Sequence, residues 1–230
     1  MSKIKHIFLD LDDTIFDFHR SESSALSKML RELGIEPTKE TVAAYSKINR
    51  ACWESLERGE TTREKLLVER FERLFKVLGK DADPRAAQKL YEGNLANEYI
   101  YIDGAMELIL SLHGKYKLYL ASNGTARVQD SRIEKSGIAK YFDGIFISER
   151  IGHDKPSREF FEKCFSSIEN FSKEEAIIVG DSLTSDILGG INAGITTCWY
   201  NPSGKPPRVD IAASYEISSL DELSDILRRI

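Results

Sequence analysis

The chain has 230 residues and a net charge of −5, which suits one large domain or a core domain that carries a smaller insert. Hydrophobic residues make up 41% and charged residues 30%, as in ordinary globular proteins, and the acidic balance argues against nonspecific nucleic-acid binding. No run approaches the ~20 apolar residues of a membrane helix, the N-terminal apolar stretch is too short for a signal peptide, and the three cysteines form no CxxC pair. We therefore expect a cytoplasmic protein without a zinc site or a disulfide framework.

Six short apolar runs recur along the chain, with helical patterns between them. They lie at residues 6–10, 117–123, 144–148, 176–181, 196–201 and 215–218. Runs this short and this apolar are typical of strands that are buried on both faces of a parallel sheet. The helical segments between them would supply the crossovers. The sequence therefore predicts an α/β fold with a Rossmann-like parallel sheet.

The region from residue 18 to residue 99 interrupts this alternation. It carries no convincing strand and has the pattern of four helices, at about residues 21–33, 39–58, 62–78 and 85–98. Gly and Pro separate these segments, and one apolar stripe marks the third, at Leu67, Phe71, Leu74 and Leu78. We expect residues 1–17 and 100–230 to form a core domain and residues 18–99 a helical cap, with hinges at residues 16–19 and 99–104.

Polar residues follow four of the predicted strands, at the carboxyl edge where open parallel sheets bind ligands. In chain order they are Asp10, Asp12, Thr14, Ser122, Asn123, Gly124, Lys155, Asp181 and Asp186. Each alone is compatible with a turn or a helix cap. Their ordered appearance at successive strand ends indicates one shared site.

The four aspartates of this set carry too much negative charge to converge without a cation. Oxygen ligands without His or Cys select a hard cation such as Mg²⁺, which also holds substrate phosphate. Ser122, Asn123 and Lys155 would add donors and a positive charge for phosphate oxygens, and Gly124 permits close backbone approach. The set therefore predicts a small phosphorylated substrate as the partner, with neither nucleic acid nor membrane involved.

The first two aspartates can divide the chemistry. Asp10 can attack phosphorus and form an aspartyl-phosphate, while Asp12 can protonate the leaving oxygen and then deprotonate water. Asp10 and Asp12 share a face on a continuing strand, whereas Asp13 points away. We therefore expect Asp13 to be a loop or capping residue.

Four motifs in this order resemble those of the haloacid dehalogenase-like (HAD) phosphohydrolases. They are DLDDT at 10–14, SNG at 122–124, the lysine of GHDKP at 152–156, and GDSLTSD at 180–186. The helical insert has the position of that superfamily's type I cap. The resemblance implies a phosphatase with one Mg²⁺ ion.

The roles that this resemblance implies follow the motifs. Asp10 would be the nucleophile and a metal ligand, and Asp12 the acid/base with its backbone carbonyl on the metal. Thr14 would support the loop, Ser122 and Asn123 would contact phosphate, and Lys155 would bridge Asp10 and phosphate. Asp181 would bind the metal directly, and Asp186 through water or through another ligand.

Longer stretches resemble the bacterial pyrimidine 5′-nucleotidases of this superfamily, which hydrolyse nucleoside monophosphates in a house-cleaning role. They lie at residues 49–71, 146–156 and 185–206. The resemblance favours a nucleoside 5′-monophosphate phosphatase. A sugar-phosphate phosphatase or phosphomutase is the alternative, and a non-catalytic binding protein on the same scaffold is a more distant one. The sequence predicts no oligomeric state.

Substrate selectivity should come from the segment that closes over the phosphate site. On the second cap helix, Trp53 can stack on a base and Asn49 can hydrogen-bond its edge, although an aromatic residue there is also compatible with the cap core. Phe16, just after the first motif, is expected to line the entrance. The three candidates for substrate specificity are therefore Phe16, Asn49 and Trp53.

Overall fold

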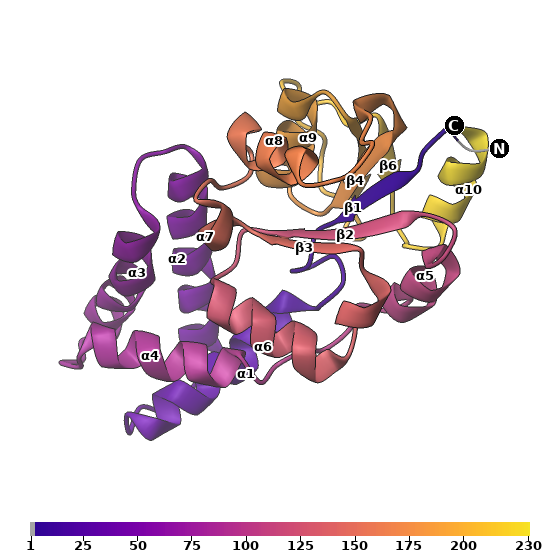
Figure 1. The fold of residues 1–230 in the computed structure, drawn as a ribbon. Coiled ribbons are helices and arrows are strands. Elements are labelled where there is room, and N and C mark those ends of the chain that lie inside the picture. The colour runs from indigo at the N-terminus through magenta and orange to yellow at the C-terminus, as the bar shows by residue number, and fades with distance from the viewer. Residues whose placement is uncertain (1–2) are drawn as a thin grey trace.

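A six-stranded parallel sheet forms the centre of the computed structural model, which describes residues 3–230 (Figure 1). Its strand order is β3-β2-β1-β4-β5-β6. The strands are β1 (His6–Leu9), β2 (Lys117–Ser122), β3 (Gly144–Ile147), β4 (Ala176–Gly180), β5 (Thr196–Tyr200) and β6 (Tyr215–Ile217). Each predicted strand is present and all pairings are parallel, so the α/β prediction is confirmed.

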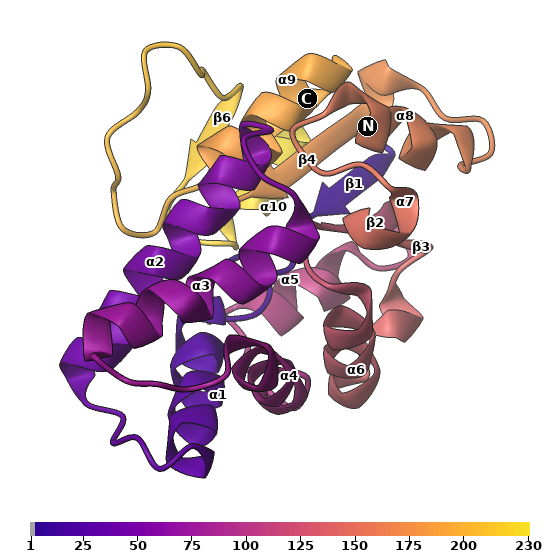
Figure 2. The same cartoon turned by 90° about the vertical axis from the view of Figure 1, so that its left-hand side faces the viewer.

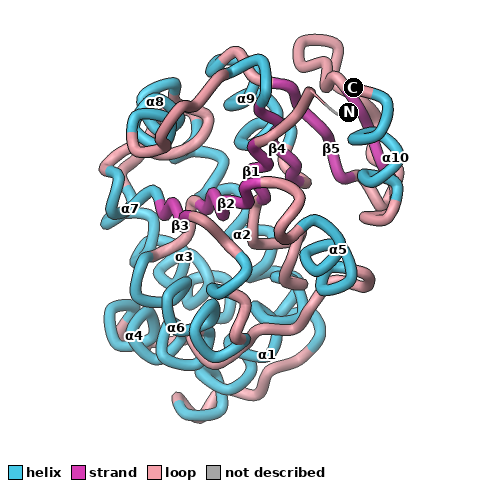
Figure 3. The backbone as a smooth tube through the Cα atoms, turned by 45° about the vertical axis from the view of Figure 1, so that its right-hand side comes forward, coloured by secondary structure: helices cyan, strands magenta, loops and turns pink. Residues whose placement is uncertain are grey.

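Helices cover both faces of the sheet, and successive residues of β1 show why. Ile7 and Leu9 pack in one apolar cluster, whereas Phe8 packs in another, because neighbouring side chains on a strand point to opposite faces. Figure 3 shows the strands as a band between α8 (Arg158–Ser166) and α9 (Leu188–Ala193) on one side and α5 (Ala105–Leu112) and α6 (Ala126–Ser136) on the other. The remaining core helices are α7 (Ser148–Ile151) and α10 (Glu222–Arg229). Within residues 3–230, no helix has the length and apolarity to cross a membrane.

The first four helices after β1 pack on one another beside the sheet (Figure 2). They are α1 (Phe18–Glu32), α2 (Lys39–Glu57), α3 (Arg63–Leu78) and α4 (Pro84–Leu95). Their own apolar cluster is centred on Tyr45, Phe71 and Tyr91, whose rings lie 5.2–5.5 Å apart. Phe71 is thus part of this cluster, and we keep residues 18–99 as the proposed boundaries of the cap.

The fourth cap helix ends three residues before its predicted end. The side-chain amide of Asn97 donates to the Gly93 carbonyl, which is the acceptor that another helical turn would use. The amides of Asn97 and Glu98 bond three residues back instead of four, a tightening that is common at helix ends. The chain therefore leaves the helix before residue 98.

Two connections join the cap to the core, and the first is shorter than predicted. Asp13, at φ 59°, accepts hydrogen bonds from the amides of Phe18 and His19 at 2.9 and 3.3 Å. It therefore caps α1, as expected, and the helix begins inside the predicted hinge at 16–19. The two connections run side by side, because the Asp17 amide donates to the Ile100 carbonyl at 2.8 Å.

Candidate active site

A buried lysine joins two of the predicted aspartates. Lys155 is 1% exposed, and its Nζ donates to Oδ1 of Asp10 at 2.7 Å, to Oδ1 of Asp186 at 2.6 Å and to the Ala121 carbonyl. Burial lowers the pKa of Lys155, but Asp10 and Asp186 outweigh burial and hold it above its ordinary value. The lysine is therefore charged and neutralises part of the carboxylate cluster.

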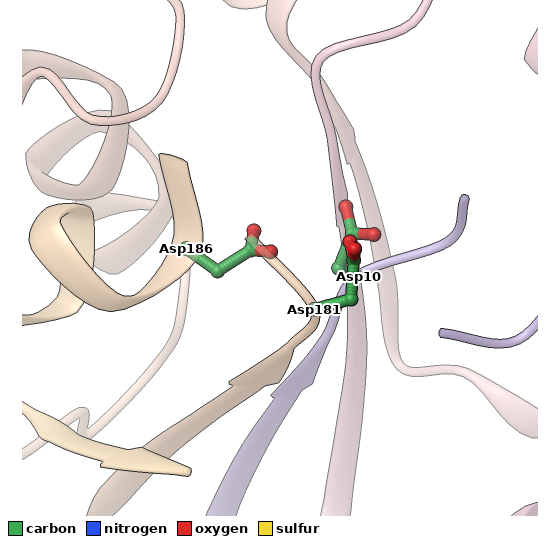
Figure 4. A group of neighbouring side chains, drawn as sticks. All are labelled: Asp10, Asp181 and Asp186. Atoms are coloured by element: carbon green, nitrogen blue, oxygen red, sulfur yellow. The ribbon is translucent and has the colours of Figure 1, made fainter. Parts of the chain in front are cut away.

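Asp10, Asp181 and Asp186 form that cluster, with one oxygen from each within 4.8 Å of the others. Figure 4 shows Asp10 and Asp181 next to each other at the ends of β1 and β4, with Asp186 reaching toward them from a helical turn. Burial raises the pKa of Asp181 to about 8, with further contributions from Asp13 and Asp186. Burial likewise raises the pKa of Asp10, although Lys155 opposes it. Three carboxylates facing one lysine fit a hard divalent cation such as Mg²⁺.

Gly180 explains how Asp186 enters the cluster. A Cβ at this position would lie 2.2 Å from Oδ2 of Asp186, so only glycine leaves room for the carboxylate. The Ser182 amide donates to that same oxygen at 3.1 Å. The turn of residues 183–187 is π-helical, a rare geometry that is frequent at functional sites.

The carboxylate of Asp12 lies apart from the cluster. Its Oδ1 accepts from Nη1 of Arg132 at 2.5 Å and its Oδ2 from Nε2 of Gln129 at 2.7 Å. Both partners lie on α6, whose residues the sequence analysis did not single out. Their spacing of three residues places them on one helix face, but the sequence has no signal that this face is buried.

The predicted phosphate contacts lie beside this network. Oγ of Ser122 accepts from the Gly124 amide at 3.1 Å and from Nε2 of Gln129 at 2.9 Å. Asn123 Nδ2 donates to the Lys155 carbonyl and Asn123 Oδ1 accepts from the Lys155 amide, both at 2.8 Å. A Cβ on Gly124 would lie 2.3 Å from Nε2 of Gln129, so the missing side chain makes room for this glutamine.

Thr14 is fully buried in the loop after β1. Its Oγ1 has no hydrogen-bond partner among residues 3–230. The loop around Thr14 is held by two backbone hydrogen bonds, which the Ile15 and Phe16 amides both donate to the Leu11 carbonyl. Thr14 therefore fills space inside this loop, and its expected role in orienting the aspartates stays a prediction.

Two neighbouring cavities lie between the cap helices and this cluster. The first has a volume of about 180 Å³ and the second of about 460 Å³. The first cavity is lined by residues of the motifs and by residues of the cap. The motif residues include Asp10, Ser122 and Lys155, and the cap residues include Trp53, Leu67 and Arg70. Both cavities share Asp12, Phe18, Trp53, Glu57, Asp181 and Ser182. A substrate phosphate at the cluster would thus have cap residues around its organic part.

The three cap and entrance candidates differ in their placement. Trp53 lines both cavities. Asn49 lines the second cavity, but its amide bonds Glu22 at 2.7 Å and Arg70 at 2.8 Å within the cap.

The expected place of Phe16 at the entrance is wrong. Its side chain is fully buried, because the ring packs 5.1 Å from the Arg132 guanidinium and 5.2 Å from Tyr101. Phe18 takes the cavity-lining position instead.

Two further polar residues join the cap to the core. Arg63, at the start of α3, donates to the Asn123 carbonyl at 2.8 Å and to Oγ of Ser148 at 2.6 Å. Glu57, at the end of α2, accepts from Oγ1 of Thr184 at 2.6 Å, and burial raises its pKa to about 7. The sequence analysis missed both, because a charged residue at a helix end usually faces solvent.

A family model described as haloacid dehalogenase-like hydrolase matches residues 4–194. Three bacterial relatives align over nearly the whole chain. The HAD-hydrolase YfnB of Bacillus subtilis is 39% identical, covering 99% of this chain and 97% of its own. The pyrimidine 5′-nucleotidase PynA of Streptococcus pneumoniae is 38% identical, covering 97% and 94%. The pyrimidine 5′-nucleotidase YjjG of Escherichia coli is 32% identical, covering 96% of each chain.

Comparison with solved structures indicates the same family. A crystal structure of YfnB bound to magnesium, which reveals interdomain movement, superposes with a TM-score of 0.94 at 39% identity and covers 97% of this chain and 98% of its own. Fold, motif order and relatives therefore agree with the resemblance found in the sequence. This chain belongs to the haloacid dehalogenase-like hydrolases.

Proposed function

We propose that this protein is a Mg²⁺-dependent phosphomonoester hydrolase that acts through an aspartyl-phosphate on Asp10, with pyrimidine nucleoside 5′-monophosphates as its preferred substrates. The observation that carries the proposal is the buried Lys155 between Asp10 and Asp186, beside Asp181 and under the cap. The names of two relatives, at 38% and 32% identity, support the substrate class. The cytoplasmic location expected from the sequence stays a prediction.

Asp10, Asp181 and Asp186 would hold the Mg²⁺ ion, together with the backbone carbonyl of Asp12. When bound, the ion supplies positive charge to the phosphate oxygens. Lys155 holds the Asp10 carboxylate in place and adds its own charge, and Ser122 and Asn123 would donate to phosphate. Such preorganised charge is usually the largest single contribution to catalysis.

The proposed reaction has two steps. An Asp10 oxygen bonds to phosphorus while the bond from phosphorus to the leaving oxygen breaks, and Asp12 gives its proton to that oxygen. Asp12 then takes a proton from water as the water oxygen attacks phosphorus, which frees phosphate and restores Asp10. A sugar-phosphate phosphatase would use the same residues, whereas a phosphomutase would pass the phosphoryl group to a second hydroxyl.

A substrate panel with a Trp53 variant tests the substrate class. We expect the wild type to have a higher kcat/KM for pyrimidine nucleoside 5′-monophosphates than for ribose 5-phosphate. Trp53→Ala should raise KM for nucleotides about tenfold or more, because ring stacking on a base contributes ~1–3 kcal/mol, while ribose 5-phosphate hydrolysis changes little.

Trp53→Phe, which keeps a ring, is the matched variant and should stay close to wild type. A preference for ribose 5-phosphate, or equal effects of Trp53→Ala on both substrates, would displace the nucleotide proposal.

Removal of metal should expose the repulsion within the cluster. Asp181 has a folded-state pKa of about 8, above the unfolded value of about 3.9. Between these values Asp181 binds more protons in the metal-free folded state than in the unfolded state, so its contribution to the free energy of unfolding falls as pH rises from about 4 to about 8. At pH 8.5, saturating Mg²⁺ should raise Tm by about 5 °C or more.

Differential scanning fluorimetry in EDTA and in Mg²⁺ measures both effects. Asp181→Asn should reduce the pH dependence and the Mg²⁺ shift. A wild-type Tm that does not respond to Mg²⁺ at pH 8.5 would argue against this metal site.

A further inference from the structure

Two buried side chains of α6 close a ring of hydrogen bonds on Asp12. Gln129 is 1% and Arg132 0% exposed, and each donates to one oxygen of the Asp12 carboxylate. Nη1 of Arg132 also donates to Oε1 of Gln129 at 2.8 Å. Because a guanidinium can only donate, this bond leaves Nε2 of Gln129 to face Asp12. Both carboxylate oxygens are therefore fixed by donors on one helix face.

The same arginine reaches the end of the cap. Its Nε donates to the Glu98 carbonyl at 2.7 Å, just after α4. The Glu98 side chain in turn accepts from Oγ of Ser24 at 2.8 Å and from Nζ of Lys28 at 2.6 Å, both on α1. One guanidinium thus contacts Asp12 in the core and the backbone of the segment that leaves the cap.

We propose that Arg132 is a positioning residue for Asp12, and that it ties the placement of this carboxyl group to the cap–core connection at Glu98. A buried guanidinium is costly unless it is paired, and here the only carboxylate that it pairs with, among the described residues, is Asp12. The inference rests on the proposed phosphatase chemistry, in which Asp12 gives a proton to the leaving oxygen.

Arg132 is not needed merely to attach α6 to the cap. Ser131 and Lys135, on the same helix, already bond the segment after α4, through the Ala96 carbonyl and the Asn97 side chain. Neither contacts Asp12. These two residues therefore supply a control that separates a structural tie from the placement of the acid.

Substrates with different leaving groups test whether Arg132 positions the Asp12 carboxyl group. An alkyl phosphate needs the Asp12 proton as its bond to phosphorus breaks, whereas p-nitrophenolate leaves as a stable anion. Arg132→Lys keeps the charge but loses the fork of donors. We expect kcat/KM for nucleoside 5′-monophosphate and ribose 5-phosphate to fall about 10–100-fold. For p-nitrophenyl phosphate the fall should stay below about threefold.

The double variant Ser131→Ala/Lys135→Met should keep the wild-type ratio of kcat/KM for the alkyl phosphates to kcat/KM for p-nitrophenyl phosphate. If Arg132→Lys does not fold, Gln129→Met tests the same ring and should shift the ratio in the same direction. If wild type is active and Arg132→Lys lowers kcat/KM equally for alkyl phosphates and p-nitrophenyl phosphate, or lowers neither, the proposed role of Arg132 is wrong. The proposed function would not be affected by that result. A wild type that hydrolyses none of these esters would overturn the proposed function and this inference together.

Discussion

Asp10→Asn should reduce phosphatase activity by at least about 10⁴-fold, because the amide cannot form the aspartyl-phosphate. The fold should survive, since an Asn oxygen can still accept the hydrogen bond from Lys155 that now joins these residues at 2.7 Å. Removing one negative charge from the carboxylate cluster should also leave the metal-free Tm unchanged or higher. Activity and Tm are therefore expected to move independently in this variant.

Asp13→Asn is the matched control for Asp10→Asn. Asp13 lies three residues further on and caps α1, and asparagine both tolerates a positive φ and accepts the same hydrogen bonds. Its kcat should stay close to wild type. Acid quenching of wild type during turnover, followed by peptide mass spectrometry, should find phosphate on the peptide that contains Asp10. Turnover that persists in Asp10→Asn would exclude the covalent mechanism.

Lys155→Met should be the most destabilising single substitution at the site. It leaves Asp10 and Asp186 buried without their cation, and breaking a buried ion pair by removing one partner costs ~3–5 kcal/mol. Activity should fall about 10²–10³-fold, as when a preorganised charge donor is lost. Urea unfolding with and without Mg²⁺ separates the two effects, because the ion should restore part of the stability and little of the activity.

Lys163→Met provides the comparison for Lys155→Met. Lys163 has an exposed hydrogen bond, from its Nζ to the Ile151 carbonyl, and its loss should change stability by less than about 1 kcal/mol. If Lys155→Met were as stable as Lys163→Met, the lysine would not be the counter-charge that its three contacts indicate.

The sequence predicted the fold well because a short apolar run is a local feature, and so is the position of a polar residue at the end of that run. Asp10, Ser122 and Asp181 could be placed at one sheet edge for that reason. Phe16 could not, because β1 already ends at Leu9. Asp13 then adopts a left-handed φ, so the strand pattern does not specify where the following side chains point.

Several residues that reach the site from helices were missed by sequence reasoning. Arg132 and Gln129 are charged or polar residues in a helix whose pattern gives no reason to bury them. Arg63 and Glu57 contact the core only because the cap folds over it. Their functional placement depends on tertiary packing between segments far apart in the chain.

The paired connections between cap and core have a mechanical consequence. Because the Asp17 amide donates to the Ile100 carbonyl, the two crossing backbones are tied to each other, and we expect any movement of the cap to pivot at this point. Glu57 and Arg63 hydrogen-bond the core from the cap helices. If product leaves through opening of the cap, we expect these contacts to break before each release.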